Sequence, residues 1–292
     1  MTELILQLLL NTLALAAAYA LVALGFVLTI NAVGSVNFAH GDLVVAGGFV
    51  AVLLGSLADL PGVVLIPAVL LLSAAFGLGF SLVAYFPLRR GPPVGIYVST
   101  IAVGVMLQNA LLNAFGPAPR RGPALIEAAP LRLADIVLSS QALATIFAAA
   151  VLVLALHLLL QRTPVGRRLR ATAQDPMMAE SVGIDTRLTI ALSFALATAL
   201  AGVAGLLLAP LHFVTPHDGA ALILKAYVAT VIGGWGRLHG ALLGTAIVAA
   251  FEVIGATLLS QPLAEALLYV VLLAVLWLRP EGLFGEAAGR RA

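Results

Sequence analysis

The feature that most constrains this chain is a series of long apolar runs separated by short polar connections. Each run holds roughly 17 to 25 residues, and a helix of that length crosses about 30 Å of hydrocarbon. Because lipid offers the backbone no hydrogen-bond partners, such runs are expected to fold as helices. The runs cover residues 4–30, 43–57, 63–86, 94–115, 137–160, 188–210, 241–259 and 263–278, with a shorter one at 222–235. The sequence therefore predicts an all-α, polytopic membrane bundle of about eight full spans and one short or re-entrant helix.

The composition supports one transmembrane domain over residues 1–292. Only 10% of the residues are charged and 62% are hydrophobic, whereas soluble domains are about 25% charged. The few basic residues form no basic face, which excludes nucleic acid as a partner. The chain has no cysteine, so a disulfide framework or a thiolate metal site is excluded, and we predict no metal site. The first apolar run is too long for a signal-peptide core, so we expect it to remain as a span.

The distribution of basic residues predicts the orientation, because arginine and lysine favour the cytoplasmic side. We place on that side Arg89, Arg90, Arg162, Arg167, Arg168, Arg170, Arg187, Arg237, Arg279, Arg290 and Arg291. Outside remain Arg120, Arg121, Arg132 and Lys225, an asymmetry of 11 to 4. If the short segment 222–235 crosses, the amino terminus lies outside and the carboxyl terminus inside. If that segment is re-entrant, one terminus changes side.

A polar stretch from residue 34 to residue 42 interrupts the first apolar region. Non-helical backbone at membrane depth is tolerated only where protein or water covers it, so this break is the first candidate for the working part of the chain, such as the lining of a path through the bundle. Its candidate residues are Ser35, Asn37, His40, Gly41 and Asp42. For Ser35 and Asn37 the alternatives are bonding to the broken backbone and contact with a polar ligand. His40 is either a structural imidazole or a proton relay, and Asp42 either caps the second span or contributes to the path.

Other polar residues lie inside predicted spans. Gly240, Gly244 and Glu252 follow one another at multiples of four, which places them on one helix face. Small residues at this spacing allow close helix contact and would turn Glu252 toward protein, where it bonds between helices or meets substrate. Gln108, Asn109 and Asn113 in the fourth span are interpreted as interhelical contacts, with lining of the path as the alternative.

The connection over about residues 161–187 is the most hydrophilic part of the chain. Asp175 can cap a short helix, Pro176 suits its first turn and Gly183 can end it. Arginines flank this predicted helix. A short capped helix on the cytoplasmic face is suited to docking another protein.

Five motifs in order carry a resemblance to a known family. They run from Gly34 to Asp42, Gly166 to Ala171, Lys225 to Gly234, Gly240 to Gly244 and Arg279 to Gly285. In this order they closely resemble the LivH-type permeases of branched-chain amino acid ABC importers. The resemblance extends over essentially the whole chain.

The resemblance implies a subunit that forms half of a channel in the bacterial inner membrane. Its expected partners are a second, LivM-like permease, two cytoplasmic ATPases and a periplasmic substrate-binding protein, with membrane lipid around it. The resemblance also implies that the helix at 175–183 couples the chain to an ATPase. The residues assigned to this coupling are Arg167, Arg170, Asp175, Pro176, Glu180 and Gly183.

The chain itself is not expected to be an enzyme. It contains no Gly-x-x-x-x-Gly-Lys-[Ser/Thr] phosphate loop, and its only lysine is Lys225, so ATP is expected on partner subunits and no cofactor in this chain. An importer of another amino acid, an amide or urea is the alternative within the family. Outside it, an ion-coupled secondary transporter is the nearer alternative. An intramembrane hydrolase lacks support because neither a Gly-x-Ser-x-Gly nor a His-Glu-x-x-His motif occurs.

Overall fold

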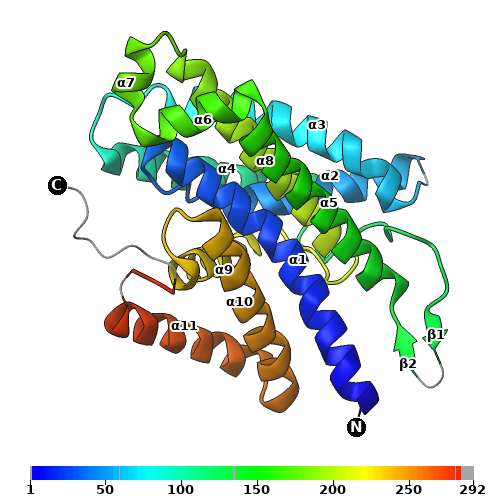
Figure 1. Ribbon diagram of the computed structural model, residues 1–292. Coiled ribbons are helices and arrows are strands. Elements are labelled where there is room, and N and C mark those ends of the chain that lie inside the picture. Colours follow the sequence, from blue (N-terminus) through cyan, green and yellow to red (C-terminus); the bar gives the residue numbers. More distant parts are fainter. Residues whose placement is uncertain (1, 59, 134–135, 280, 284–292) are drawn as a thin grey trace.

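The computed structural model describes residues 2–58, 60–133, 136–279 and 281–283. Within them, eight helices are long and apolar enough to span a membrane, and one shorter apolar helix accompanies them. The eight are α1 (Thr2–Val33), α2 (His40–Ala58), α3 (Gly62–Phe80) with its π-helical extension η1 (Ser81–Tyr85), α4 (Pro93–Phe115), α5 (Ser140–Arg162), α8 (Thr186–Leu208), α10 (Leu238–Leu258) and α11 (Gln261–Leu278); the shorter helix is α9 (Gly219–Gly233). The prediction of eight full spans and one short helix is confirmed (Figure 1).

Helices α1 and α8 form the centre of the bundle. In their most apolar stretches 89% and 83% of the residues are buried, compared with 17% to 28% in α3, α4, α5 and α11. Small residues allow this central position. A Cβ atom added to Gly202 would lie 1.9 Å from Ser73 Oγ in α3, and one added to Gly205 would lie 2.0 Å from the Val44 carbonyl oxygen in α2. The outer helices keep apolar surface free for lipid.

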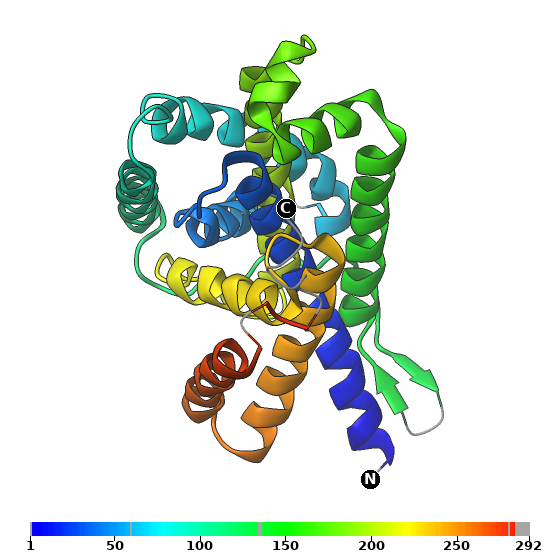
Figure 2. The same cartoon turned by 60° about the vertical axis from the view of Figure 1, so that its left-hand side comes forward.

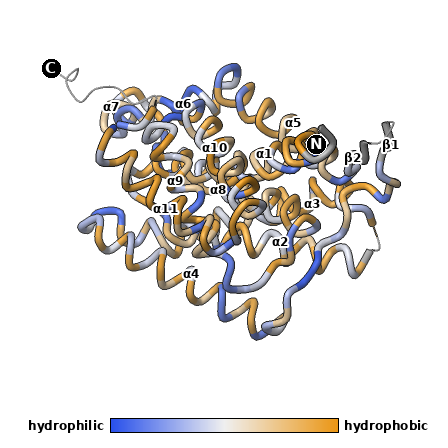
Figure 3. The backbone as a smooth tube through the Cα atoms, turned by 90° about the horizontal axis from the view of Figure 1, so that it is seen from below, coloured by the Kyte–Doolittle hydropathy of each residue, from blue (hydrophilic) through white to orange (hydrophobic). Residues whose placement is uncertain are grey.

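Two short helices occupy the hydrophilic connection after α5. They are α6 (Pro164–Gln174) and α7 (Pro176–Ser181). The prediction had no helix at α6, although the sequence carries its start signals: Thr163 Oγ1 accepts a hydrogen bond from the Gly166 amide at 3.1 Å, and Pro164 opens the helix. Both helices lie at the end of the bundle opposite the start of α1 (Figure 1). Figure 3 shows hydrophilic residues concentrated here and in the connections between helices.

The all-α class is confirmed, and the α4–α5 connection adds a small β-hairpin that the prediction did not include. Strand β1 (Leu131–Leu133) pairs antiparallel with β2 (Ile136–Leu138). The predicted span starting at Val137 is therefore wrong at its beginning. Helix α5 starts only at Ser140 because Ser139 caps it, accepting a hydrogen bond from the Ala142 amide.

Helix α9 carries the chain across the middle of the bundle (Figure 2). Before it, the end of α8 is bonded to the α4–α5 connection, where the Gly122 amide donates to the Ala209 carbonyl oxygen at 3.0 Å. After it, the turn lies beside the carboxyl end of α1, where Asn31 Nδ2 donates to the Gly236 carbonyl oxygen at 2.9 Å. The segment therefore does not return the chain to the end at which α8 finishes. This geometry favours the crossing alternative over the re-entrant one.

Candidate functional site

The interruption between α1 and α2 turns the chain back into the bundle. Gly34 has a φ of +68°, a conformation that favours glycine, directly after the last turn of α1. Asn37 is 2% exposed, and its Oδ1 atom accepts a hydrogen bond from the Ala39 amide at 3.1 Å. Ser35 is also buried. Asn37 thus bonds to the broken backbone, the first of the two roles considered for it.

His40 fixes the start of α2 against the middle of α1. Its ring is fully buried, and Nε2 lies 3.0 Å from the Val22 carbonyl oxygen, so the tautomer protonated at Nε2 donates this bond. Gly25 leaves the space, because a Cβ atom there would lie 3.0 Å from His40 Cε1. No carboxylate in the described part of the chain pairs with the ring. The geometry fits a structural imidazole and offers no proton relay.

Helices α2, α4 and α9 meet at Gly41 and Asp42. A Cβ atom added to Gly41 would lie 1.9 Å from the Gly219 carbonyl oxygen. The Asp42 carboxylate fits between α4 and α9 because both present glycine: its oxygens would lie 2.5 Å and 2.1 Å from Cβ atoms added to Gly104 and Gly219. Of the two roles considered for Asp42, no capping bond from it is seen among the described residues: its carboxylate extends toward the neighbouring helices, and Asn37 accepts the bond from the Ala39 amide.

A closed ring of hydrogen bonds joins α1, α9 and α10 around the only lysine of the chain. Lys225 Nζ donates to Glu252 Oε1 at 2.7 Å and to Tyr19 Oη at 3.1 Å, and Tyr19 Oη donates to Glu252 Oε2 at 2.9 Å. Lys225 and Glu252 are 7% and 9% exposed. Glu252 therefore bonds between helices, the first role considered for it.

The position of Lys225 corrects the orientation argument, which counted it among external residues. The residue lies inside α9 and is paired within the bundle. The sequence signal for a site was present, because a lone lysine in an apolar run is costly unless a partner balances its charge. The sequence alone did not identify Glu252 as that partner.

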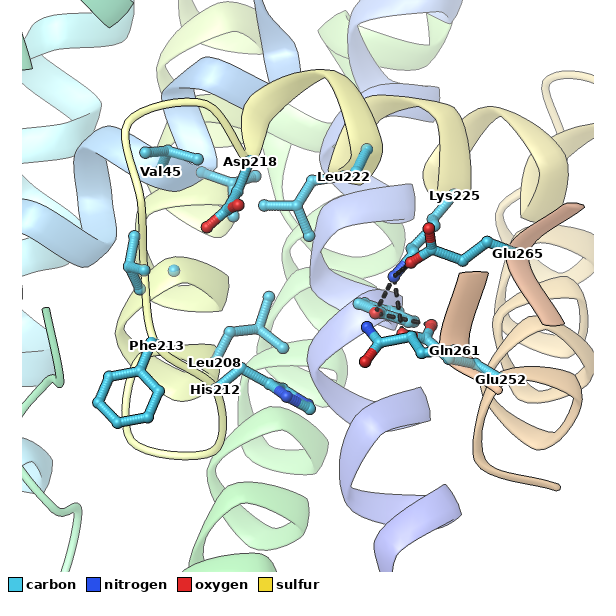
Figure 4. Close-up of a pocket in the computed structure, with 15 residues that line it drawn as sticks. Val45, Leu208, His212, Phe213, Asp218, Leu222, Lys225, Glu252, Gln261 and Glu265 are labelled. Atoms are coloured by element: carbon cyan, nitrogen blue, oxygen red, sulfur yellow. Dashed lines mark hydrogen bonds and ion pairs between the residues drawn. The ribbon is translucent and has the colours of Figure 1, made fainter. Parts of the chain in front are cut away.

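The ring forms one wall of a cavity of ≈ 190 Å³. Glu265, in α11, adds a carboxylate to this wall, with its Oε1 atom 3.7 Å from Lys225 Nζ. Figure 4 shows Lys225, Glu252 and Glu265 on one side of the cavity and Val45 and Leu222 on the other. Such a lining suits a small molecule with a charged headgroup and an apolar body.

The predicted small-residue face of α10 lies in contact with α9. A Cβ atom added to Gly240 would lie 2.2 Å from the Gly233 carbonyl oxygen, and one added to Gly244 would lie 1.9 Å from the Ala229 carbonyl oxygen. The two helices run antiparallel at this contact. Their close approach brings the lysine of α9 within bonding distance of the carboxylate of α10.

The short helix α7 has the capping geometry that its sequence predicts. Asp175 Oδ1 accepts hydrogen bonds from the Met177 and Met178 amides at 2.9 Å and 3.0 Å, and Pro176 is the first helical residue. Gly183 follows the helix with a φ of +84°. This segment is therefore a formed element at one end of the bundle.

The polar residues assigned to coupling take different positions. Glu180 Oε1 accepts a hydrogen bond from Thr186 Oγ1, which ties α7 to the first turn of α8. Arg167 is exposed on α6 and Arg170 is half-buried. Arg290 and Arg291, predicted on the same side, lie outside the described residues.

Three large apolar side chains project from α7 and the turn after it, beside the exposed polar residues Glu180 and Ser181. Met177, Met178 and Val182 are 81%, 64% and 74% exposed. Sequence reasoning missed them, although apolar residues in the most hydrophilic segment of the chain were a readable signal. Because this segment lies outside the spans, their exposure is not explained by lipid contact.

The amides of α4 do not make the predicted set of interhelical contacts. Asn109 Nδ2 donates to the Val105 carbonyl oxygen at 2.8 Å, and Asn113 Nδ2 donates to the Asn109 carbonyl oxygen at 2.9 Å, both within α4. Gln108 alone reaches another element, with Nε2 2.7 Å from His217 Nδ1 before α9. The prediction is wrong for the two asparagines because carbonyl oxygens of their own helix satisfy them.

The sequence matches a family along most of its length. The family described as "Branched-chain amino acid transport system / permease component" matches residues 8–276. The chain is 30% identical over 294 residues to the high-affinity branched-chain amino acid transport system permease protein BraD of Pseudomonas aeruginosa, covering 96% of each chain. It is 29% identical to the corresponding LivH protein of Escherichia coli K12, again over 96% of each chain.

More distant similarity extends to an archaeal relative and to a solved structure. The probable LivH permease of Methanocaldococcus jannaschii is 29% identical over 91% of this chain and 88% of its own length. The solved structure of PsaBC from Streptococcus pneumoniae in complex with Fab aligns with a TM-score of 0.51 over 94% of this chain and 92% of that chain. At 15% identity this last match shows the fold alone.

Proposed function

Because the chain belongs to the family of branched-chain amino acid transport permease components, we propose that it forms half of the path by which an ABC importer carries branched-chain amino acids across the membrane. The observation that carries this proposal is the 30% identity to BraD over 96% of both chains. The eight-span bundle supports it. The chain is thus a multi-pass membrane transport subunit, with ATP hydrolysis proposed on separate partner subunits.

The partners belong to the proposal. A second, LivM-like permease completes the path, two cytoplasmic ATPases hydrolyse ATP, and a periplasmic binding protein delivers the substrate at the bacterial inner membrane. The sequence contains no phosphate loop of its own, which supports ATP binding on separate subunits. The α6–α7 segment would face the ATPases, and the start of α1 would face the delivery protein.

The translocation path is proposed at the meeting point of α2 and α9. Broken or shortened helices in transporters commonly place their ends at the substrate path. Asn37 and His40 hold the start of α2 in place, Ser35 is buried in the turn before it, and Gly41 lets α9 approach. Asp42 receives no hydrogen bond from any described residue, so its carboxylate remains available at this junction.

A reconstituted complex tests the function directly. Proteoliposomes that contain this chain, the second permease and the ATPases, supplied with the delivery protein, should accumulate leucine, isoleucine and valine only when ATP is present. Uptake of a different amino acid, an amide or urea in place of these would select the alternative within the family. Uptake driven by an ion gradient without ATP would overturn the proposal in favour of secondary transport.

The exposed methionines of α7 give a test of coupling. We expect Met177→Ser with Met178→Ser to lower ATP-dependent leucine uptake at least about tenfold, because apolar anchors contribute most of the binding energy at protein interfaces. ATPase subunits should also co-purify less with the variant. Leucine uptake and ATPase co-purification are the two measurements.

The matched control changes the same two positions without losing apolar surface. Met177→Leu with Met178→Leu should retain uptake and co-purification, because helix α7 keeps its cap from Asp175 and its apolar tip. Equal uptake by the serine and leucine variants would show that this surface does not dock the ATPase.

A further inference from the structure

Lys225 keeps one hydrogen-bond donor free. A lysine ammonium group carries three N–H donors. Two are used by Glu252 and Tyr19 at 2.7 Å and 3.1 Å. The nearest additional carboxylate in the described residues, Glu265, lies 3.7 Å away, which is beyond hydrogen-bond distance. One donor therefore remains for a partner that enters the cavity.

Glu265 offers the complementary group. Its side chain is 33% exposed, and it comes from α11, outside the helices that form the ring. Its carboxylate makes a long ion pair with Lys225 at 3.7 Å, and no described residue donates a hydrogen bond to it. Since Glu252 already balances the charge of Lys225, the cluster carries one excess negative charge, located on Glu265. An unused donor of Lys225 and a loosely paired carboxylate thus lie side by side at the cavity wall, close enough for one zwitterionic headgroup to contact both.

The remaining lining is mostly apolar. Val44, Val45, Leu208 and Leu222 form the aliphatic part of the cavity. Unlike Glu265, Asp218 already accepts two hydrogen bonds from the protein. The Thr215 amide donates to its carboxylate at 2.6 Å and the Thr215 hydroxyl at 2.7 Å. Figure 4 shows Val45 and Leu222 on the side opposite Lys225 and Glu265, with Asp218, whose carboxylate bonds to Thr215, beside them.

We propose that this cavity is a binding site for an aliphatic amino acid in its zwitterionic form. Lys225 Nζ donates its third hydrogen bond to the carboxylate of the substrate, Glu265 accepts from the ammonium group, and the side chain lies along Val45, Leu208 and Leu222. The choice of substrate rests on the proposed function. The two headgroup contacts rest on the unused third donor of Lys225 and on the Glu265 carboxylate, which receives no hydrogen bond from the described residues.

A purely structural role accounts for only part of the cluster. Tyr19, Lys225 and Glu252 already satisfy one another in a closed ring. Glu265 adds only a 3.7 Å ion pair with Lys225, whose charge Glu252 already balances at 2.7 Å. The ring instead holds the lysine ammonium in one orientation, which lowers the cost of ordering it when a ligand binds.

Direct binding to the assembled complex tests the site. The probe is tritiated leucine added to the complex of both permeases and the ATPases in lipid nanodiscs, without the delivery protein. We expect saturable binding by the parent and at least about tenfold weaker binding by Glu265→Gln, because the variant loses a charge-assisted bond to the ammonium group. Leucinamide, which lacks the carboxylate, and 4-methylpentanoate, which lacks the ammonium group, should each compete at least about tenfold less well than leucine.

Glu127→Gln is the matched control, since it removes an exposed carboxylate in the α4–α5 connection and should bind leucine like the parent. Both variants should match the parent in gel-filtration profile and thermal midpoint. Parental binding by Glu265→Gln, or no saturable binding by the parent, would overturn the site. Failure of the proposed function would be seen separately, as absence of ATP-dependent uptake of branched-chain amino acids by the parental complex with its delivery protein.

Discussion

Lys225→Met should destabilise the protein by about 3–5 kcal/mol, because it leaves a carboxylate buried without its counter-charge. Glu252 is 9% exposed, and Lys225 Nζ lies 2.7 Å from its Oε1 atom. Tyr19 would remain as a hydrogen-bond donor but cannot neutralise the charge. The purified protein is unfolded in mixed micelles by titration with a denaturing detergent. Comparing the parent and the variant gives the change in the free energy of unfolding.

The double variant separates the missing charge from the missing side chain. Lys225→Met with Glu252→Gln should recover most of the lost stability, because no uncompensated charge remains in the bundle. Glu265→Gln should cost less than about 1 kcal/mol, since its carboxylate is partly exposed and lies 3.7 Å from the lysine. Equal losses for the single and double variants would show that the ion pair does not determine stability here.

The fold could be predicted to a large extent because the bilayer itself fixes the length of its helices. Runs long enough to cross hydrocarbon have one way to satisfy their backbone, so the eight spans follow from hydropathy. Helix α6 was missed for the opposite reason. Its residues are polar and rich in arginine, and only the local signals of Thr163 and Pro164 distinguish it from a loop.

For the candidate site, the sequence predicted individual residues and one helix face but not how they come together. Helical spacing placed Gly240, Gly244 and Glu252 on one face, and the structure has that face against α9. Periodicity identifies a face and says nothing of the partner across it. Lys225 lies 27 residues from Glu252 and 206 from Tyr19, so their bonding depends on tertiary packing that one sequence does not reveal.

Two neighbouring side chains could also accept the same hydrogen bond, and sequence spacing does not indicate which of them does. Asn37 and Asp42 are both good acceptors near the start of α2, and either could have satisfied a free amide there. The structure gives that bond to Asn37. Asp42 extends instead between Gly104 and Gly219, where only the absence of side chains on two other helices makes room for it.

At the contact between α9 and α10, a single larger side chain should lower the stability of the protein through steric clash alone. Gly244→Leu should destabilise the protein by about 3 kcal/mol, at the upper end of the usual cost of overpacking. A Cβ atom at this position would lie 1.9 Å from the Ala229 carbonyl oxygen, which is backbone and cannot rotate away. The helices would have to separate, and the ion pair between them would lengthen. The thermal midpoint of the purified complex and the free energy of unfolding in mixed micelles measure the effect.

Gly79→Leu is the matched control, because a Cβ atom at Gly79 in α3 has no heavy atom within 4 Å. Both substitutions gain about 1 kcal/mol of helix propensity over glycine, so the difference between them isolates the steric cost. If Gly244→Leu acts by parting α9 from α10, it already weakens the bond from Lys225 to Glu252. Adding Lys225→Met with Glu252→Gln should then cost less than the sum of the separate effects, since sites that share one contact are not independent. Full additivity would mean that the helices accommodate leucine without moving the ion pair.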